Sequence, residues 1–225
     1  MASQTLLQLR TRMLQRAAME SNQAVSTVEA NSYINSACAE TYRALVRHWG
    51  YDRFESQLDY SIVSDKAYTS SAPPALVDTS AWLALLSIHL LFPNGALVPI
   101  TTFAQVDRDR KWFGGYLWRR ENIRYRAVNG AIEFEPVGKA SGWTGTIRYV
   151  SDYVPLTSDS SSFDGRVSGW DDRTVLRAAA MARTKLRLDV SDLNMEIASF
   201  DAGLDAAAMT FQRGAAQKAP RRSRW

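Results

Sequence analysis

Residues 123–135, with the sequence IRYRAVNGAIEFE, contain the pattern that decides the fold class of the central part of this chain. Apolar and polar residues alternate on both sides of Asn129-Gly130, which is the spacing of a half-buried β-strand. Asn-Gly tolerates the positive φ angles of a type I′ turn, so the stretch predicts a two-stranded hairpin. Its buried face is expected to hold Ile123, Tyr125, Ile132 and Phe134.

The two-residue period extends outward from this hairpin, from Tyr51 to about Pro155. A second pair, Asn94-Gly95, separates the apolar stretches 87–92 and 96–101 and predicts a second hairpin with the same turn. Further strands are expected at 143–150 and 58–63. The polar residues 102–111 are expected to form a short helix between the hairpins.

Helical spacing precedes this region. Thr5 with Gln8, and Ser26 with Glu29, have the three-residue separation of a capping box. They predict helices at about 5–19 and 27–49, the second ending at Gly50. The buried stripe expected along the second helix is Val28, Ile34, Ala37, Thr41 and Leu45.

Helical spacing returns after Trp170. Asp171 and Asp172 lie where a helix N-terminus favours negative charge. A last helix is expected to begin at Asp189 or Ser191, and beyond Gln212 the composition is typical of an extended arm. One face of that helix is expected to hold Leu193, Ile197, Phe200, Leu204 and Phe211.

These segments together predict an α+β fold. Residues 1–50 and 156–212 would form a helical bundle built from both ends of the chain. Residues 51–155 would be a β-rich insertion in it. Residues 213–225 would be a basic, extended C-terminal arm.

Composition excludes several classes of protein. The chain has 225 residues, of which 46% are hydrophobic and 22% charged, as in ordinary globular proteins. No apolar run approaches the roughly 18 residues of a membrane-spanning helix. Cys38 is the only cysteine, so no intrachain disulfide can form. Because the first residues also do not resemble a signal peptide, we expect the protein to be made in a reducing cytoplasm.

Groups capable of catalysis are scarce. The two histidines, His48 and His89, are expected at a helix end and on a strand surface. Glu133 and Glu135 share one strand face, and the simplest interpretation of such a pair is a solvated surface. We therefore expect no enzymatic activity, no metal and no cofactor.

Charge is segregated near the C-terminus. Residues 173–188 contain five basic residues and no acid, whereas residues 189–212 contain five acids and no base. Two antiparallel helices would pair these charges with one another. Alternatively, part of the acidic face could line a channel that repels DNA, in which case the candidates are Asp192, Glu196, Asp201 and Asp205.

The last thirteen residues account for the positive net charge of +4, because they carry five cations and no acid. Arginines next to a tryptophan suit nucleic-acid binding by charge and stacking. They equally suit anchoring in a groove of a protein partner. A solubilising tail is the third alternative. The residues concerned are Arg213, Lys218, Arg221, Arg222, Arg224 and Trp225.

The N-terminal region resembles the head-to-tail adaptor proteins of tailed bacteriophages, also called neck or connector proteins. The resemblance lies in residues 9–12, 16–22, 25–26, 31–35 and 40–46, with looser similarity at 79–82, 92–95, 129–136, 147–151 and 163–165.

This resemblance implies a non-enzymatic virion protein. Such a protein forms a homo-oligomeric ring, expected to be a dodecamer, beneath the portal protein. The ring would contact tail or nozzle proteins and extend a channel for double-stranded DNA without reading its sequence. The protein would lie in the neck of the virion after assembly in the host cytoplasm, with no membrane contact. The arm from Arg213 to Trp225 would bind the portal. The alternative from the residues themselves is a basic-tailed DNA-binding module.

Overall fold

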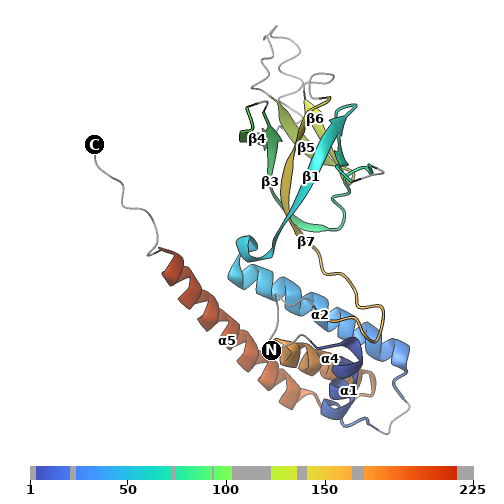
Figure 1. Cartoon of the computed structure of the whole chain (residues 1–225). Coiled ribbons are helices and arrows are strands. Elements are labelled where there is room, and N and C mark those ends of the chain that lie inside the picture. Colours follow the sequence, from blue (N-terminus) through green and yellow to red (C-terminus); the bar gives the residue numbers. More distant parts are fainter. Residues whose placement is uncertain are drawn as a thin grey trace. The chain divides into compact units, whose positions relative to one another are not determined.

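The computed structural model describes residues 4–20, 24–71, 74–92, 94–102, 123–135, 141–163 and 170–216, without the side chains of 205 and 207–216. Contacts divide the chain into two compact units. One combines Met1–Arg53 with Tyr153–Trp225 and is helical; the other is Phe54–Asp152 and is built of strands. Figure 1 shows the elements of each unit.

The strand unit is a closed barrel of seven strands in the order β1-β2-β6-β5-β4-β3-β7. Neighbouring strands are antiparallel except β4 and β5, which are parallel. A 3-10 turn, Tyr51–Phe54, leads into the first strand. The strands are β1 (Glu55–Val63), β2 (Lys66–Thr69), β3 (Trp82–Leu91), β4 (Leu97–Thr102), β5 (Arg124–Val128), β6 (Ala131–Glu135) and β7 (Thr144–Ser151).

Closure of the barrel depends on β7, which pairs with β1 on one side and β3 on the other. The interior is filled by side chains, with the Tyr60 and Phe134 rings stacked at 5.6 Å between centroids. Around this stack the core contains Ile62, Ile88, Leu90, Ile132 and Ile147. The barrel therefore has a hydrophobic core of its own.

This closure contradicts the predicted fold. A helical bundle with a β-rich insertion is wrong, because residues 54–152 form a closed seven-stranded barrel that is a unit in itself. Alternating residues predict strands but do not reveal which distant strands pair. The pairing of Glu55 with Val150, for example, joins residues far apart in the sequence.

Both predicted hairpins are present. Asn129 and Gly130 have φ angles of 50° and 77°, and Val128 pairs with Ala131, as a type I′ turn requires. The other hairpin has a longer turn than expected, because the Phe92 N–H donates to the Ala96 carbonyl across three intervening residues. Nearly all of the helix predicted at 102–111 lies outside the described residues.

The helical unit contains α1 (Leu6–Arg16), α2 (Thr27–Trp49), α4 (Asp171–Lys185) and α5 (Ser191–Ala216). The two predicted capping boxes are confirmed, at Thr5 and at Ser26. Ile34, Ala37, Thr41 and Leu45 of the predicted stripe are buried. Val28 is not, with 78% of its surface exposed, because it lies in the first turn of α2.

The extended arm predicted from residue 213 is wrong at its start. Helix α5 continues to Ala216, so Arg213 is helical. Residues 217–225 lie outside the described part of the chain.

Candidate docking surface of the C-terminal helix

Helix α5 is fixed at its start by a network around Arg183 of α4. The Asp189 carboxylate accepts hydrogen bonds from the backbone N–H and hydroxyl of Ser191, and these bonds lower the pKa of Asp189. The Arg183 guanidinium donates to Asp192 at 2.9 Å and to the backbone carbonyl of Arg16 at 3.0 Å. The α4–α5 turn is thereby tied to the end of α1.

Nine residues after Asp192, α5 is fixed to the start of α4. The Arg173 guanidinium, which is buried, donates to Asp201 at 2.6 Å and to the Thr41 hydroxyl of α2 at 3.0 Å. The indole of Trp170 lies edge-on to Phe200, with 6.5 Å between ring centroids. Leu204, the next apolar residue on this face, is fully buried.

Beyond Leu204 the helix continues for twelve residues, past the point where α4 begins (Figure 1). At 1.5 Å per residue, this extension is about 18 Å long. An isolated helix of this length is marginal in water, so a helical extension gains stability when a partner packs against it. The extension of α5, residues 205–216, is thus the candidate docking element of the helical unit.

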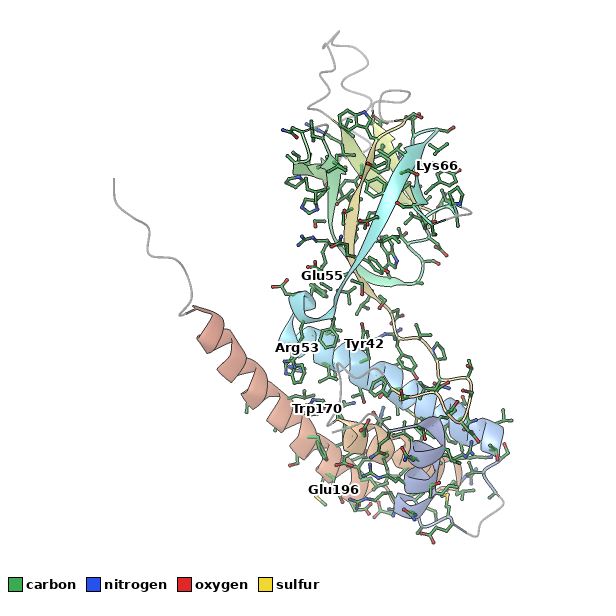
Figure 2. All side chains as sticks on the ribbon, viewed as in Figure 1. Tyr42, Arg53, Glu55, Lys66, Trp170 and Glu196 are labelled. Carbon is green, nitrogen blue, oxygen red and sulfur yellow. The ribbon has the colours of Figure 1, made fainter. Side chains whose placement is uncertain are left out.

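An aromatic cluster lies beside the base of this extension, in the helical unit. The ring centroids of Trp49 and Trp170 are 5.8 Å apart, edge to face. Arg53 places its guanidinium 4.3 Å from the centre of a Trp49 ring, a cation–π contact. Figure 2 shows Arg53 and Trp170 on this side of the unit. Sequence reasoning missed the cluster, because Trp170 is far in the sequence from Trp49 and Arg53 and no local pattern joins them.

The four acids predicted to line a channel have different surroundings. Asp192 pairs with Arg183, and Asp201 with Arg173, so these charges are matched between α4 and α5. Glu196 pairs instead with Arg16 of α1, at 3.7 Å. Asp205 lies in the extension of α5, and its side chain is outside the described part. Three of the four candidates therefore have a cationic partner within their own unit.

The six predicted arm residues are divided by the end of α5. Arg213 belongs to its last turn, although its side chain is outside the described part. Lys218, Arg221, Arg222, Arg224 and Trp225 all follow the last described residue.

The groups considered for catalysis are separated from one another. Burial raises the pKa of the Cys38 thiol to about 12, against the weaker effect of hydrogen bonds with Tyr153 and Thr174. Such a thiol is a poor nucleophile at neutral pH. The Arg126 guanidinium forms an ion pair with the Glu133 carboxylate at 2.6 Å. The Nδ1 atom of His89 lies 3.5 Å from the Ser87 hydroxyl. Within the described ranges, no three His, Cys, Asp or Glu side chains are grouped as metal ligands.

No protein-family model and no curated protein matches the chain, so these comparisons assign no function to the site. In the described part of the chain, no helix combines the length and apolar character needed to cross a membrane.

Proposed function

We propose that the protein is a structural subunit of the neck of a tailed bacteriophage, without enzymatic activity. Copies of the chain would assemble as a ring beneath the portal, connect the head to the tail and extend the DNA channel. The partners would be the portal protein, tail or nozzle proteins and neighbouring copies, with DNA passing through without sequence readout.

The observation that carries this proposal is the extension of α5. A helix that continues for about 18 Å beyond Leu204, past the start of α4, is suited to contact a second protein (Figure 1). The basic residues of the C-terminus follow directly after it, so the same end of the chain offers a helix, four cations and a terminal tryptophan. Arginine and tryptophan are the residues most enriched at energetically important interface positions.

Two further features support a structural role. The N-terminal residues that resemble head-to-tail adaptors form the capped helices α1 and α2, the scaffold against which α4 is packed. The barrel interior is filled by a continuous apolar core, which suits a rigid module. A head-to-tail contact between identical copies generates a ring when the rotation closes.

The test is docking to purified portal, followed by native mass spectrometry and negative-stain imaging. We expect many copies of the full chain per portal, arranged as a ring. A chain ending at Ala216 should keep its melting temperature, because the nine residues removed are mostly polar or charged and include a single large apolar side chain, Trp225, and it should lose stable docking. A single copy per portal, or normal docking of the truncated chain, contradicts the proposal.

A matched pair of variants separates specific contacts from bulk charge. Arg221→Gln with Arg222→Gln removes two cations from the arm. Arg47→Gln with Arg187→Gln removes two exposed cations from the helical unit. Only the first pair should weaken docking; equal effects would indicate nonspecific attraction.

DNA binding by the basic arm is the second candidate function. It predicts that the full chain binds free duplex DNA, with an affinity that falls steeply as salt increases. Loss of this affinity in the chain ending at Ala216, with portal docking unchanged, would favour that function over the adaptor.

A further inference from the structure

Asp171 is the one described residue with a completely buried side-chain oxygen that lacks a hydrogen bond. It is the first residue of α4, only 7% of its surface is exposed, and the unpartnered atom is Oδ1. Buried polar atoms are nearly always satisfied, and leaving a charged one unsatisfied is more costly than leaving a neutral one. This position therefore needs an explanation.

Arg12 of α1 is the cation that acts electrostatically on Asp171, but its guanidinium is hydrogen-bonded to other groups. Its guanidinium bonds to the neighbouring Asp172 and donates to Gln4 at 2.9 Å. Arg12 thus favours a charged Asp171 without bonding to it, whereas the like charge of Asp172 opposes it.

The other titratable or charged groups around the start of α4 also have partners. The Tyr153 phenol donates to the Asn35 side chain of α2 at 2.7 Å. Arg173 and Asp201 bind one another across α4 and α5. The Cys38 thiol of α2 interacts with Tyr153 and Thr174. Among the described residues, none of these groups forms a hydrogen bond with the Asp171 carboxyl.

Together, the effects of its surroundings on Asp171 raise the pKa of this carboxyl and so favour its neutral form. Burial has the largest effect on Asp171 and raises its pKa, and Asp172 acts in the same direction. The attraction of Arg12 lowers the pKa but does not cancel the increase.

We propose that Asp171 is a proton-linked switch at the start of α4. The neutral carboxylic acid is the form that this buried position accommodates better, and loss of the proton weakens the first turn of α4. That turn contacts α5 through the Trp170–Phe200 and Arg173–Asp201 pairs. Protonation of Asp171 therefore also stabilises the position of α5 against α4. The inference concerns the folded unit alone and does not depend on the proposed neck function.

The sign of the pH dependence follows from linkage. A carboxyl whose pKa is higher in the folded than in the unfolded chain contributes its full stability below the unfolded value, about 3.9. That contribution is lost as the pH rises through the folded pKa. The salt-bridged carboxylates of the unit act in the opposite direction, so a variant is needed to isolate Asp171.

The experiment compares urea unfolding of the full chain and of Asp171→Asn between pH 4 and pH 8. The ratio of the wild-type to the variant folding constant should fall about tenfold for each unit by which the folded pKa is raised. Asp172→Asn is the control, because this carboxylate has a cationic partner and should give a ratio that does not fall with pH. A ratio for Asp171→Asn that is constant or rises with pH overturns the proposal.

Two measurements keep the test decisive if the Asn variant does not fold. A carbon-13 NMR titration of the wild-type Asp carboxyl groups gives the pKa directly, with Asp171 assigned by the loss of its signal in Asp171→Glu. A value at or below about 3.9 overturns the proposal. Amide exchange in the first turn of α4 of the wild type, divided by the intrinsic rate at each pH, should show weaker protection at pH 8 than at pH 5. Equal protection at both pH values would also refute the switch.

Discussion

Gly145 occupies the tightest position that the structure gives for any glycine, and replacing it with alanine should severely destabilise the barrel. It lies in β7 between two neighbours, pairing with Tyr60 of β1 and with Leu90 of β3. A Cβ added at Gly145 would lie 2.0 Å from the backbone carbonyl oxygen of His89 and 2.9 Å from the Tyr60 hydroxyl. The first of these atoms belongs to the backbone, so a side-chain rotation cannot relieve the clash.

The size of the effect follows from what must move. Separating β7 from β3 by more than 1 Å would break the 3.2 Å hydrogen bond from the Tyr60 hydroxyl to the His89 carbonyl. Loss of that bond, whose Tyr60 side chain is fully buried, costs about 1–3 kcal/mol. Steric overpacking in a filled core costs about 1–3 kcal/mol more. We therefore expect Gly145→Ala to lower the free energy of unfolding by about 2–6 kcal/mol.

The assay is urea unfolding followed by tryptophan fluorescence, with two companion variants. Gly203→Ala is the matched control, because no atom lies within 4 Å of its added Cβ and Gly203 is in the helix α5. It should stabilise the protein by about 0.5–1 kcal/mol, as alanine does in helices. In a Tyr60→Phe background, where the hydroxyl bond is already absent, Gly145→Ala should cost only the steric part, about 1–3 kcal/mol, because the His89 carbonyl remains. A cost below about 1 kcal/mol for Gly145→Ala would refute this reasoning.

Four further predictions concern the hairpin turns, Arg173, Cys38 and Glu29. Gly95→Val and Gly130→Val should each lower the unfolding free energy by about 1–3 kcal/mol, because their φ angles are 80° and 77°, and unchanged melting of both would contradict the turn assignments. Arg173→Leu should cost about 1–3 kcal/mol in chemical unfolding, since it removes the 3.0 Å donor of the buried Thr41 hydroxyl, which keeps only its 3.2 Å contact with Thr174, and removes the cation paired with Asp201. Cys38 should resist iodoacetamide at pH 8 in the folded protein and react once urea unfolds it, because burial raises the pKa of its thiol to about 12; rapid labelling of native protein would refute this. Hydrogen bonds from Lys185 and Ser26 lower the pKa of Glu29 to about 2, so the stability difference between wild type and Glu29→Gln should be present above about pH 4.3 and disappear as the pH falls through 2.

Local features of the fold were predictable from the sequence. The capping boxes at Thr5 and Ser26 and the Asn129-Gly130 turn depend on residues within four positions of one another. Their geometry is therefore determined by side chains and φ angles that the local sequence specifies. Of the two starts predicted for the last helix, Asp189 and Ser191, the second is the one observed for α5.

Strand β2 shows what the local pattern lacks. It follows β1 through Ser64 and Asp65, which both adopt positive φ angles, of 48° and 63°. No glycine or asparagine marks this turn, so residues 64–65 carry no strong hairpin signal. Barrel closure was likewise unpredictable, since β2 meets β6 through the single pair Lys66 and Glu133. Such non-local contacts depend on the total arrangement of strands and leave no periodic trace.

The charges of the candidate site were predictable as a pattern but not as individual pairs. Segregation of basic and acidic residues correctly indicates an interaction between α4 and α5, as seen for Arg173 with Asp201. The partner of Glu196 could not be inferred in this way, because Arg16 comes from α1. Its pairing depends on which helix packs beside the α4–α5 turn, a tertiary relation that the charges of two helices do not contain.

The first two residues of α4 show how the same local rule can conceal opposite environments. The helix macrodipole favours an acid at both Asp171 and Asp172, so the sequence treats them alike. Successive residues of a helix point about 100° apart, however, and here one turns inward and the other outward. Asp172 keeps 52% of its side chain exposed and binds Arg12, whereas Asp171 is buried with an unsatisfied oxygen. Neutralising these adjacent acids should consequently have opposite effects on stability at neutral pH: Asp172→Asn removes a favourable charge, and Asp171→Asn removes the cost of burying one.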